Sequence, residues 1–463
     1  MESIVRLSSL KISNIKNVRN GQIIMPYTCK KQLSYKEAEV LGVYGQNGSG
    51  KTAVIDTLYY LQRIMTGNTL DTEIADYIDV NGSQAEVMAD FNIFSEKVTY
   101  ETSYKIVIQK NGKEAEIVRE TLSCAVNRDG SRSNKTVFMD YQRSDRENVF
   151  APKKRLDEVI EANLLNKMDL MVARKMAEKS NCSYIFGESS REIFCQEYEN
   201  HFKDCSEVIK LLFIYALRDL FVIRNTHSGV ISANFLLPMA FKIEQDEIGM
   251  RGDFAVPLTE PVVLSEERKK ILEAIVEQVN MVLFTIIPGM EIGVHDYGMQ
   301  LTDSGETGYR VELVSVRRGK PPIPIRMESE GIIKIISILN VLIQAFGNPS
   351  ICLAIDELDA GIFEYMLGEL LDIFNKSAKG QLIFTSHNLR ALEMLDKDSI
   401  MFSTANPDRR YIRMKNIKPS NNLRDTYIRG LTLGGQDEVI YEETDSLRIA
   451  RAFRKAGRAT RHE

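Results

Sequence analysis

The chain has 463 residues, 44% of them hydrophobic, and a formal net charge of −5, which fits a large folded core and argues against a uniformly basic nucleic-acid binder. The six cysteines are scattered without a C-x-x-C pair, which argues against a disulfide framework or a zinc site. We found neither a secretory signal nor an apolar run long enough to cross a membrane, so we expect a cytoplasmic protein with no membrane partner.

The chain opens with strand patterns that lead to a glycine-rich motif. Residues 4–12 and 21–25 alternate in the manner of strands around a polar turn. The apolar run 38–44 indicates a buried strand, and residues 53–65 carry apolar side chains at helical spacing. Between them lies a G-x-x-x-x-G-K-[ST] motif, flanked by strand and helix as a phosphate-binding loop requires. Its residues are Gly45, Gln46, Asn47, Gly48, Ser49, Gly50, Lys51 and Thr52.

This loop predicts a nucleotide site. Its glycines allow successive backbone N–H groups to point at phosphate oxygens, and the helix N-terminus adds its dipole. We expect Lys51 to reach the β- and γ-phosphates and the Thr52 hydroxyl to bind Mg²⁺. ATP and Mg²⁺ are therefore the expected ligands.

An antiparallel sheet is expected after the first helix. Residues 86–94, 98–109 and 114–125 alternate, and the Asn111-Gly112 pair lies between the last two of these runs. Strand patterns around Asn-Gly are typical of a β-hairpin. The following residues, 127–154, are polar and predict a loop.

Helices are expected next. Apolar residues recur three and four positions apart in three segments, which predicts a helical insertion that could serve packing or contact with a partner. Further along we expect an irregular stretch, a helix and three short strands. The helical segments are 156–179, 190–204 and 206–224; the others are 226–264, 266–284, 291–300, 309–317 and 322–327.

Two later apolar strands end in polar side chains. The run 351–355 ends in Asp356 and Glu357, and the run 381–386 ends in His387 about one βαβ unit later. The carboxyl ends of neighbouring parallel strands meet at one edge of a sheet. Asp356 suits a Mg²⁺ site with Thr52. Glu357 is the expected general base toward water, and His387 the expected catalytic partner at the γ-phosphate.

A fourth motif precedes an apolar helix. Ser329 and Gly331 lie at the predicted start of helix 332–346. A serine there can cap the helix, and the N–H groups of a helix start can also bind an anion. The residues alone leave both roles open.

In their order and spacing these motifs resemble the ABC-type ATPase heads of the SMC, Rad50, RecF and OLD group, and within it the AAA_15 branch. The resemblance covers residues 1–125 and 290–405 and includes the opening stretch 10–17. It implies that Lys16 approaches nucleotide. It also implies a Q-loop glutamine, for which Gln142 is a candidate.

The resemblance further implies that two copies enclose ATP head to tail. Ser329 and Gly331 would then complete the nucleotide site of the other copy, and Asp359 would belong to the D-loop at the dimer contact. The motif here is Glu-Ser-Glu-Gly-Ile instead of the usual L-S-G-G-Q/E.

We therefore expect an α/β fold: an ABC-type ATPase head with a mixed sheet, an antiparallel β-subdomain and a helical insertion. The expected parts are an N-terminal lobe (1–125), a polar connection and helical insertion for dimerisation or partner contact (126–290), a C-terminal lobe (291–420) and a basic tail (421–463).

The layout also resembles ATPase subunits of PARIS-type anti-phage defence systems. This implies a homo-oligomer such as a hexamer, a TOPRIM nuclease effector as partner, and a phage-encoded trigger protein. The alternatives are a RecF/Rad50-like ATPase of DNA repair and a binding module in which nucleotide is structural.

Two features near the C-terminus bear on nuclease activity and on contact with nucleic acid. Asp396-Lys397-Asp398 has an acidic spacing, but it is interpreted as a turn at a helix end because too few residues follow for a nuclease sheet. Residues 444–463 are basic, with Leu447, Ile449, Phe453 and Ala456 as a candidate apolar stripe. They could form a solvated tail or contact nucleic acid or a protein.

Overall fold

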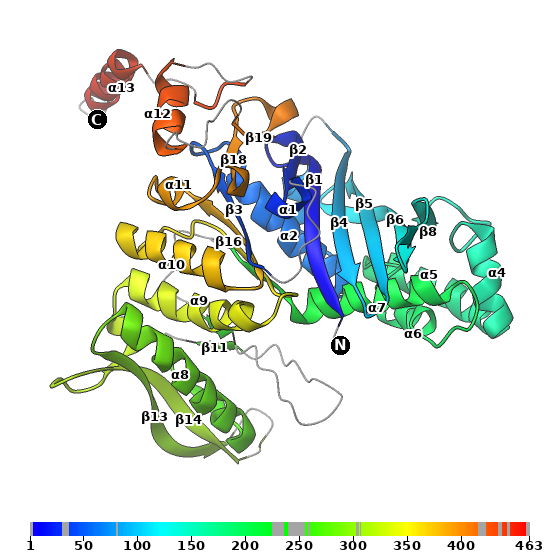
Figure 1. The fold of residues 1–463 in the computed structure, drawn as a ribbon, viewed down its shortest axis with the longest axis horizontal. Coiled ribbons are helices and arrows are strands. Elements are labelled where there is room, and N and C mark those ends of the chain that lie inside the picture. Colours follow the sequence, from blue (N-terminus) through cyan, green and yellow to red (C-terminus); the bar gives the residue numbers. More distant parts are fainter. Residues whose placement is uncertain are drawn as a thin grey trace.

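Two sheets with different hydrogen-bonding patterns organise the chain (Figure 1). A parallel sheet carries the motifs identified above, and a long antiparallel sheet lies beside it. The computed structural model describes residues 3–29, 37–79, 82–224, 236–238, 255–257, 260–301, 305, 307–414, 423–433, 438–441 and 445–459.

The central sheet has six strands in the order β19-β18-β3-β17-β16-β9, all parallel except β19. Strands β3, β16 and β17 are buried on both faces, as expected for a parallel sheet covered on both sides. Their carboxyl ends therefore lie at a common edge. The strands are β3 (Glu39–Tyr44), β9 (Leu220–Ile223), β16 (Cys352–Ile355), β17 (Gln381–Ser386), β18 (Ile400–Ser403) and β19 (Tyr411–Ile412).

The antiparallel sheet is built mainly from consecutive hairpins in the order β2-β1-β4-β5-β6-β7, with β8 also paired to β6. The expected hairpin is confirmed, since β5 and β6 meet at Asn111 and Glu114 around Gly112, which has a φ of 64°. The strands are β1 (Ile4–Ile15), β2 (Val18–Ile24), β4 (Gln84–Phe94), β5 (Val98–Asn111), β6 (Glu114–Arg128), β7 (Ser131–Arg132) and β8 (Thr136–Gln142).

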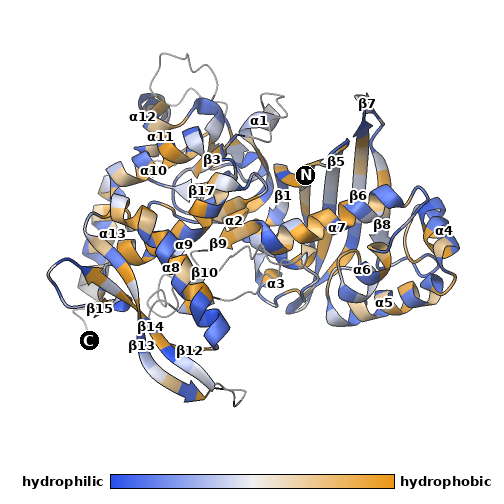
Figure 2. Ribbon diagram, turned by 60° about the horizontal axis from the view of Figure 1, so that its bottom comes forward, coloured by the Kyte–Doolittle hydropathy of each residue, from blue (hydrophilic) through white to orange (hydrophobic). Residues whose placement is uncertain are grey.

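Helices fill the space between and around these sheets. Helix α2 follows the phosphate loop and packs in one hydrophobic core with the antiparallel sheet and α7. Figure 2 shows the apolar residues along α2 and α7. The helices of this half are α1 (Pro26–Cys29), α2 (Lys51–Met65), α3 (Ile74–Tyr77), α4 (Lys153–Ala162), α5 (Asn166–Ser180), α6 (Glu188–Phe194) and α7 (Lys203–Arg218).

A second core covers the other face of the central sheet. It joins α8, α9 and α10 to a smaller sheet of order β12-β14-β13, with β15 paired to β14. The helices are α8 (Glu266–Ile286), α9 (Glu330–Gly347), α10 (Glu364–Ser377) and α11 (Ala391–Met394). The strands are β12 (Val262–Leu264), β13 (Met290–Leu301), β14 (Thr307–Arg317) and β15 (Ile323–Pro324).

Short elements and the C-terminal helices complete the described chain. Helix α13 lies beyond α12 at the edge of the molecule (Figure 1). These elements are β10 (Leu236–Pro238), β11 (Ala255–Pro257), the 3₁₀ turns η1 (Ile325–Met327), η2 (Lys397–Ser399) and η3 (Pro407–Arg409), α12 (Leu423–Leu433) and α13 (Ser446–Ala459).

Helix α9 is the one helix in the described part of the chain that is long and apolar enough to cross a membrane. Most of its residues from Gly331 to Ala345 are buried, and it packs between α8 and the central sheet. It is therefore a core helix of this fold.

Strand β8 corrects the expectation of a loop over 127–154. Phe138, Met139 and Tyr141 are buried, and β8 pairs with β6 through the register Leu122↔Met139. The surrounding Asn, Asp, Ser and Arg residues obscured a short edge strand, because its polar alternate residues resemble the loops on either side.

Strand β9 corrects a second expectation. Residues 206–224 were expected to be one helix, but α7 ends at Arg218 and the apolar run Leu220–Ile223 pairs in parallel with β16. A four-residue apolar run satisfies strand and helix patterns equally, and pairing with β16 decides between them. Residues 322–327 form a two-residue strand and a 3₁₀ turn, and most of the stretch 226–264 lies outside the described residues.

The expected fold class is confirmed. The chain has an α/β fold with a mixed central sheet, an antiparallel β-subdomain and a cluster of helices, α4 to α7. In the sequence these helices come after β3 and before the other strands of the central sheet. Strand β3 comes from the N-terminal part of the chain, whereas β16, β17 and β18 come from the C-terminal part, so the central sheet unites both ends of the sequence.

Candidate functional site

The phosphate loop connects the end of β3 to the start of α2. Gly48 and Gly50 have φ values of 78° and 91°, in the left-handed region that glycine adopts without strain. At Gly45 a Cβ atom would lie 1.9 Å from Ser403 Oγ. Ser49 Oγ donates to the Gln46 carbonyl over 2.6 Å. These contacts hold the backbone in a tight turn at the helix N-terminus, where an anion is favoured.

Lys51 is drawn into this turn. Its ammonium donates to the carbonyls of Gly45 and Gln46 over 2.8 and 2.9 Å, and the side chain is buried. Burial lowers the pKa of Lys51 to about 8, against the opposing charges of Asp356, Glu357 and Asp359. A lysine so placed can exchange loop carbonyls for phosphate oxygens.

Asp356 lies beside the loop at the end of β16. Its Oδ1 accepts from Thr385 Oγ1 over 2.6 Å and from Thr52 Oγ1 over 3.3 Å. Burial raises the pKa of Asp356, and the two threonine hydroxyls oppose that rise. The structure thus brings the two expected Mg²⁺ residues, Thr52 and Asp356, into direct contact.

Glu357 follows Asp356 in an unusual backbone conformation. Its φ of 47° is uncommon for a residue with a side chain. The Glu357 N–H donates to Thr385 Oγ1 over 2.7 Å, and Lys334 of α9 donates its ammonium to the Glu357 carbonyl. These two contacts hold the Glu357 backbone in this conformation.

His387 follows β17 and lies next to the acids. Its N–H donates to Asp359 Oδ2 over 3.1 Å. Burial lowers the pKa of His387, as does the neighbouring charge of Lys51. The imidazole is therefore neutral near pH 7, so it can donate at one nitrogen and accept at the other.

The Ser329–Gly331 motif lies at the start of α9. Ser329 is exposed and caps the helix by accepting from the Ile332 N–H. Gly331 is buried against the turn that contains Asp359, and a Cβ at Gly331 would lie only 1.8 Å from the Gly361 carbonyl oxygen. The motif and the turn after β16 are therefore in backbone contact within one chain, which only glycine at 331 permits.

Lys16 lies on the turn between β1 and β2. Its ammonium forms an ion pair with Asp56 and lies 4.3 Å from the centre of the Tyr77 ring. Asp56 is one turn beyond Thr52 in α2 and is 1% exposed. Lys16 is thus tied to the phosphate-loop helix through Asp56.

Arg224 was not found from the sequence. It follows β9, donates from Nε to Asp56 Oδ1 over 2.7 Å, and stacks over the Tyr59 ring at 4.3 Å. The Asp356 N–H donates to the Ile223 carbonyl, which fixes the end of β9 beside Asp356. Because residues 206–224 were expected to be helical, no signal placed Arg224 at the sheet edge.

Gln142, the candidate for a Q-loop position, lies elsewhere. It ends β8, where its amide donates to Asp140 Oδ2 over 3.0 Å. In the central sheet β16 lies between β9 and β17, whereas β8 belongs to the antiparallel sheet. Gln142 therefore does not follow a strand that neighbours β16.

Further contacts that the sequence did not indicate brace the phosphate loop. Asn17 donates to the Gly48 carbonyl, and Tyr411 Oη donates to the Gly50 carbonyl over 2.6 Å. Ser403 Oγ is in hydrogen-bond contact with Ser49 Oγ. These residues come from both ends of the chain, and no local motif marks them.

The structure therefore gathers most of the predicted residues at one edge of the central sheet. Lys51, Thr52, Asp356, Glu357, Asp359 and His387 are linked through the contacts above. Ser329 and Gly331 adjoin the same edge through Gly361, and Lys16 joins it through Asp56.

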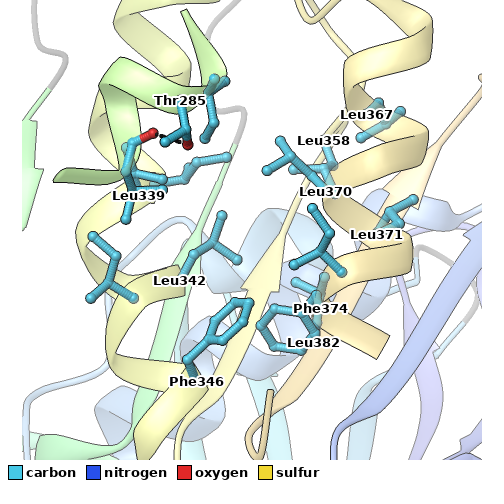
Figure 3. A pocket seen from close by; sticks show the side chains of 15 residues that line it. Thr285, Leu339, Leu342, Phe346, Leu358, Leu367, Leu370, Leu371, Phe374 and Leu382 are labelled. Carbon is cyan, nitrogen blue, oxygen red and sulfur yellow. Dashed lines mark hydrogen bonds between the residues drawn. The ribbon is translucent and has the colours of Figure 1, made fainter. Parts of the chain in front are cut away.

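An apolar cavity is a separate feature. It measures about 430 Å³ and lies between α8, α9 and α10, with Leu339, Leu342, Phe346, Leu371 and Phe374 among its lining (Figure 3). Its lining residues carry no charged side chain, so it offers nothing to a triphosphate. The phosphate-binding candidate remains the loop at β3.

Comparisons with known proteins give an overall likeness only. No family model matches the sequence, and no curated protein does. An SMC head bound to the C-winged helix domain of ScpA covers 88% of this chain and 98% of its own, at 14% identity and a TM-score of 0.43. The head of the Pyrococcus furiosus Smc, bound to the C-terminal domain of ScpA, covers 88% of this chain and 96% of its own, at 15% identity and a TM-score of 0.42. The head of the Pyrococcus yayanosii Smc covers 92% of this chain and 100% of its own, at 14% identity and a TM-score of 0.42.

Proposed function

We propose that this chain is a Mg²⁺-dependent ATPase that works as a nucleotide-dependent switch. The observation that carries the proposal is the common sheet edge at which the phosphate loop meets Asp356, Glu357 and His387. The hydrogen bond from Thr52 to Asp356 supports a shared Mg²⁺ position, because hydroxyl and carboxylate oxygens are the ligands that Mg²⁺ prefers.

Each residue has a defined task in this proposal. Lys51 leaves the loop carbonyls and donates to phosphate oxygens, and the bound Mg²⁺ neutralises charge there. Glu357 accepts a proton from the attacking water as general base. The neutral imidazole of His387 positions the same water through a hydrogen bond, while Asp359 holds the His387 backbone.

The proposal includes a head-to-tail pair of copies. Ser329 is exposed at the N-terminus of α9, where it is accessible to a nucleotide held by another copy. Asp359 Oδ1 is buried without a hydrogen-bond partner among the described residues. Asp359 also accepts from the His387 N–H, so a contact that a second copy makes at this turn would couple association to the state of the site.

Replacing Glu357 with Gln tests the assigned base. We expect Glu357→Gln to keep ATP binding and lower kcat by about 10²-fold or more, because the amide cannot accept the proton. The closed pair should accumulate with ATP and be visible by mass photometry. Glu369→Gln, an exposed carboxylate of α10, is the matched control.

Two results would count against this assignment. Wild-type turnover in Glu357→Gln would remove Glu357 as the base. Tight ATP binding by the unmodified chain with negligible turnover would instead favour the binding-module alternative, in which nucleotide is structural.

We further propose a role in anti-phage defence. The support is the resemblance in layout to the AriA ATPase subunits of PARIS-type systems. By that resemblance the chain forms a homo-oligomer such as a hexamer, holds a TOPRIM nuclease effector and releases it when a phage-encoded trigger protein binds.

Purification with the native gene neighbourhood tests this role. The tagged chain should co-purify a nuclease in a complex that changes on adding ATP, as read by mass spectrometry and mass photometry. Recovery of the chain with DNA alone would overturn the defence role.

A RecF/Rad50-like DNA-binding ATPase is the alternative. The observation in its favour is α13, whose exposed residues include Arg448, Arg451, Arg454 and Lys455. This function predicts ATP-dependent binding of duplex DNA that weakens steeply with salt. No binding at low salt would exclude it.

A further inference from the structure

The outer face of helix α5 carries a continuous apolar stripe. Leu165, Met168, Val172 and Met176 recur three or four residues apart and therefore share one face of the helix. Leu164 and Met171 flank them. All six side chains are between 49% and 79% exposed. The helix lies with α4 and α6 at the outer end of the molecule, beyond the antiparallel sheet (Figure 1).

This stripe is not needed for packing within the chain. The opposite face of α5 already supplies the buried residues Leu170, Ala173 and Ala177 to the core. A surface helix normally presents polar residues outward. Helix α5 carries large apolar side chains on its exposed side as well as on its buried side, which is typical of a helix that packs on a second surface.

The size of the stripe matches a protein interface. Six such side chains expose on the order of 600 Å². This area is at the upper end of the range found for the largest apolar patch on the surface of monomeric proteins. A twofold contact uses the patch twice and buries about 1,200 Å², the lower bound of stable interfaces. Methionines, three of the six, adapt readily to a facing helix.

The charges around the stripe favour a second copy in the antiparallel direction. The exposed charged residues at its N-terminal end are Glu161, Lys167 and Asp169, with a net charge of −1, and those at its C-terminal end are Lys175 and Lys179. An antiparallel pair brings opposite ends together, and it also aligns the two helix dipoles favourably. A parallel pair would oppose like charges.

We propose that α5 forms a twofold, antiparallel interface with α5 of a second copy, centred near Val172. This surface is separate from the phosphate loop and from Ser329, so the contact needs no nucleotide. Such an isologous contact uses the same patch on both subunits.

The first test is self-association of the full chain without nucleotide, measured by analytical ultracentrifugation with EDTA. Val172→Glu places two carboxylates together at the axis and should raise the dimer dissociation constant by at least 100-fold. Met168→Glu should act similarly. Met299→Glu, an equally exposed methionine on β13, is the matched control and should change nothing.

The outcomes are decisive because all these side chains are exposed, and circular dichroism checks the fold of each variant. A wild-type chain that stays monomeric at all concentrations without nucleotide would overturn the proposal. So would a loss of association in Met299→Glu equal to that in Val172→Glu.

A second test reads the direction of the helices. In an antiparallel pair centred at Val172, position 168 of one copy faces position 176 of the other. A mixture of Met168→Cys and Met176→Cys chains should crosslink with a bismaleimide faster than either variant alone, above the background of the unmodified chain. Faster crosslinking of Met168→Cys with itself would overturn the antiparallel arrangement.

Discussion

At the scale of single residues, the burial of Lys51 predicts that the proposed binding of nucleotide depends on pH. Its pKa is about 8 because the side chain is buried, so it loses its proton as the pH rises through that value. An anionic phosphate requires the ammonium form, and binding above pH 8 must therefore take up a proton. We expect ATP affinity to fall by up to about tenfold per pH unit above the pKa.

Isothermal titration calorimetry between pH 7 and 9.5 measures this fall, and buffers of different ionisation enthalpy measure the proton uptake. Lys51→Arg is the control, because a guanidinium stays charged throughout this range. Its affinity should be independent of pH whatever its absolute value. If the ATP affinity of the unmodified chain is equally independent of pH, burial of Lys51 does not control binding.

Asp56 permits a second prediction at this scale. Its carboxylate is 1% exposed and is paired with Arg224 and Lys16. Removing the partner of a buried ion pair costs about 3 kcal/mol. Removing Arg224 leaves Lys16 as a partner of Asp56, so this figure is the upper limit for Arg224→Ala. We expect Arg224→Ala to lower the thermal transition by up to about 3 °C in a chain of this size.

The double variant Asp56→Asn with Arg224→Gln should melt between the unmodified chain and Arg224→Ala, since it removes both charges. Differential scanning fluorimetry gives the order. If the double variant melts below Arg224→Ala, the unpaired charge of Asp56 is not what destabilises Arg224→Ala.

At the scale of elements, α9 and the turn after β16 act as one unit. Gly331 allows the backbone of α9 to touch Gly361, and Lys334 of the same helix holds the Glu357 carbonyl. Because a Cβ at 331 would overlap the Gly361 oxygen, Gly331→Ala must separate α9 from the turn that carries Asp359.

We expect Gly331→Ala to lower ATP turnover and ATP-dependent pairing by at least tenfold while the chain remains folded. Gly347→Ala, in the last position of the same helix, has no atom within 4 Å of the added Cβ and is the matched control. Steady-state phosphate release and mass photometry provide the readouts. Normal turnover in Gly331→Ala would show that the turn tolerates the displacement.

The elements also show how far the sequence alone leads. The phosphate loop, the strand-end acids and the hairpin at Asn111-Gly112 were predictable because each depends on local chemistry. Strand β9 was not, because its four residues are decided by pairing with β16. The roles of Arg224 and Tyr411 could not be predicted for the same reason, because these residues reach the site only when distant segments of the chain come together.

At the scale of the whole molecule, both ends of the chain build the candidate site while its middle builds the outer face. Strand β3 and helix α2 are N-terminal, and strands β16 to β18 are C-terminal. The helices α4 to α7 are inserted between them in the sequence, and α4 and α5 lie at the outer end of the molecule (Figure 1). The exposed apolar stripe belongs to α5. The two proposed contacts therefore use different surfaces of one subunit.

Two different twofold contacts on one subunit join copies into larger assemblies, which close into rings when the angles allow. In the Glu357→Gln background with ATP, we expect the chain to form assemblies larger than a dimer, and adding Val172→Glu should reduce them to dimers held by nucleotide alone. Adding Met299→Glu should leave them unchanged. Mass photometry resolves these species at nanomolar concentration. Dimers in every background would mean that the α5 contact does not form. Monomers in the Val172→Glu chain with ATP would mean that α5 provides the nucleotide-dependent contact as well.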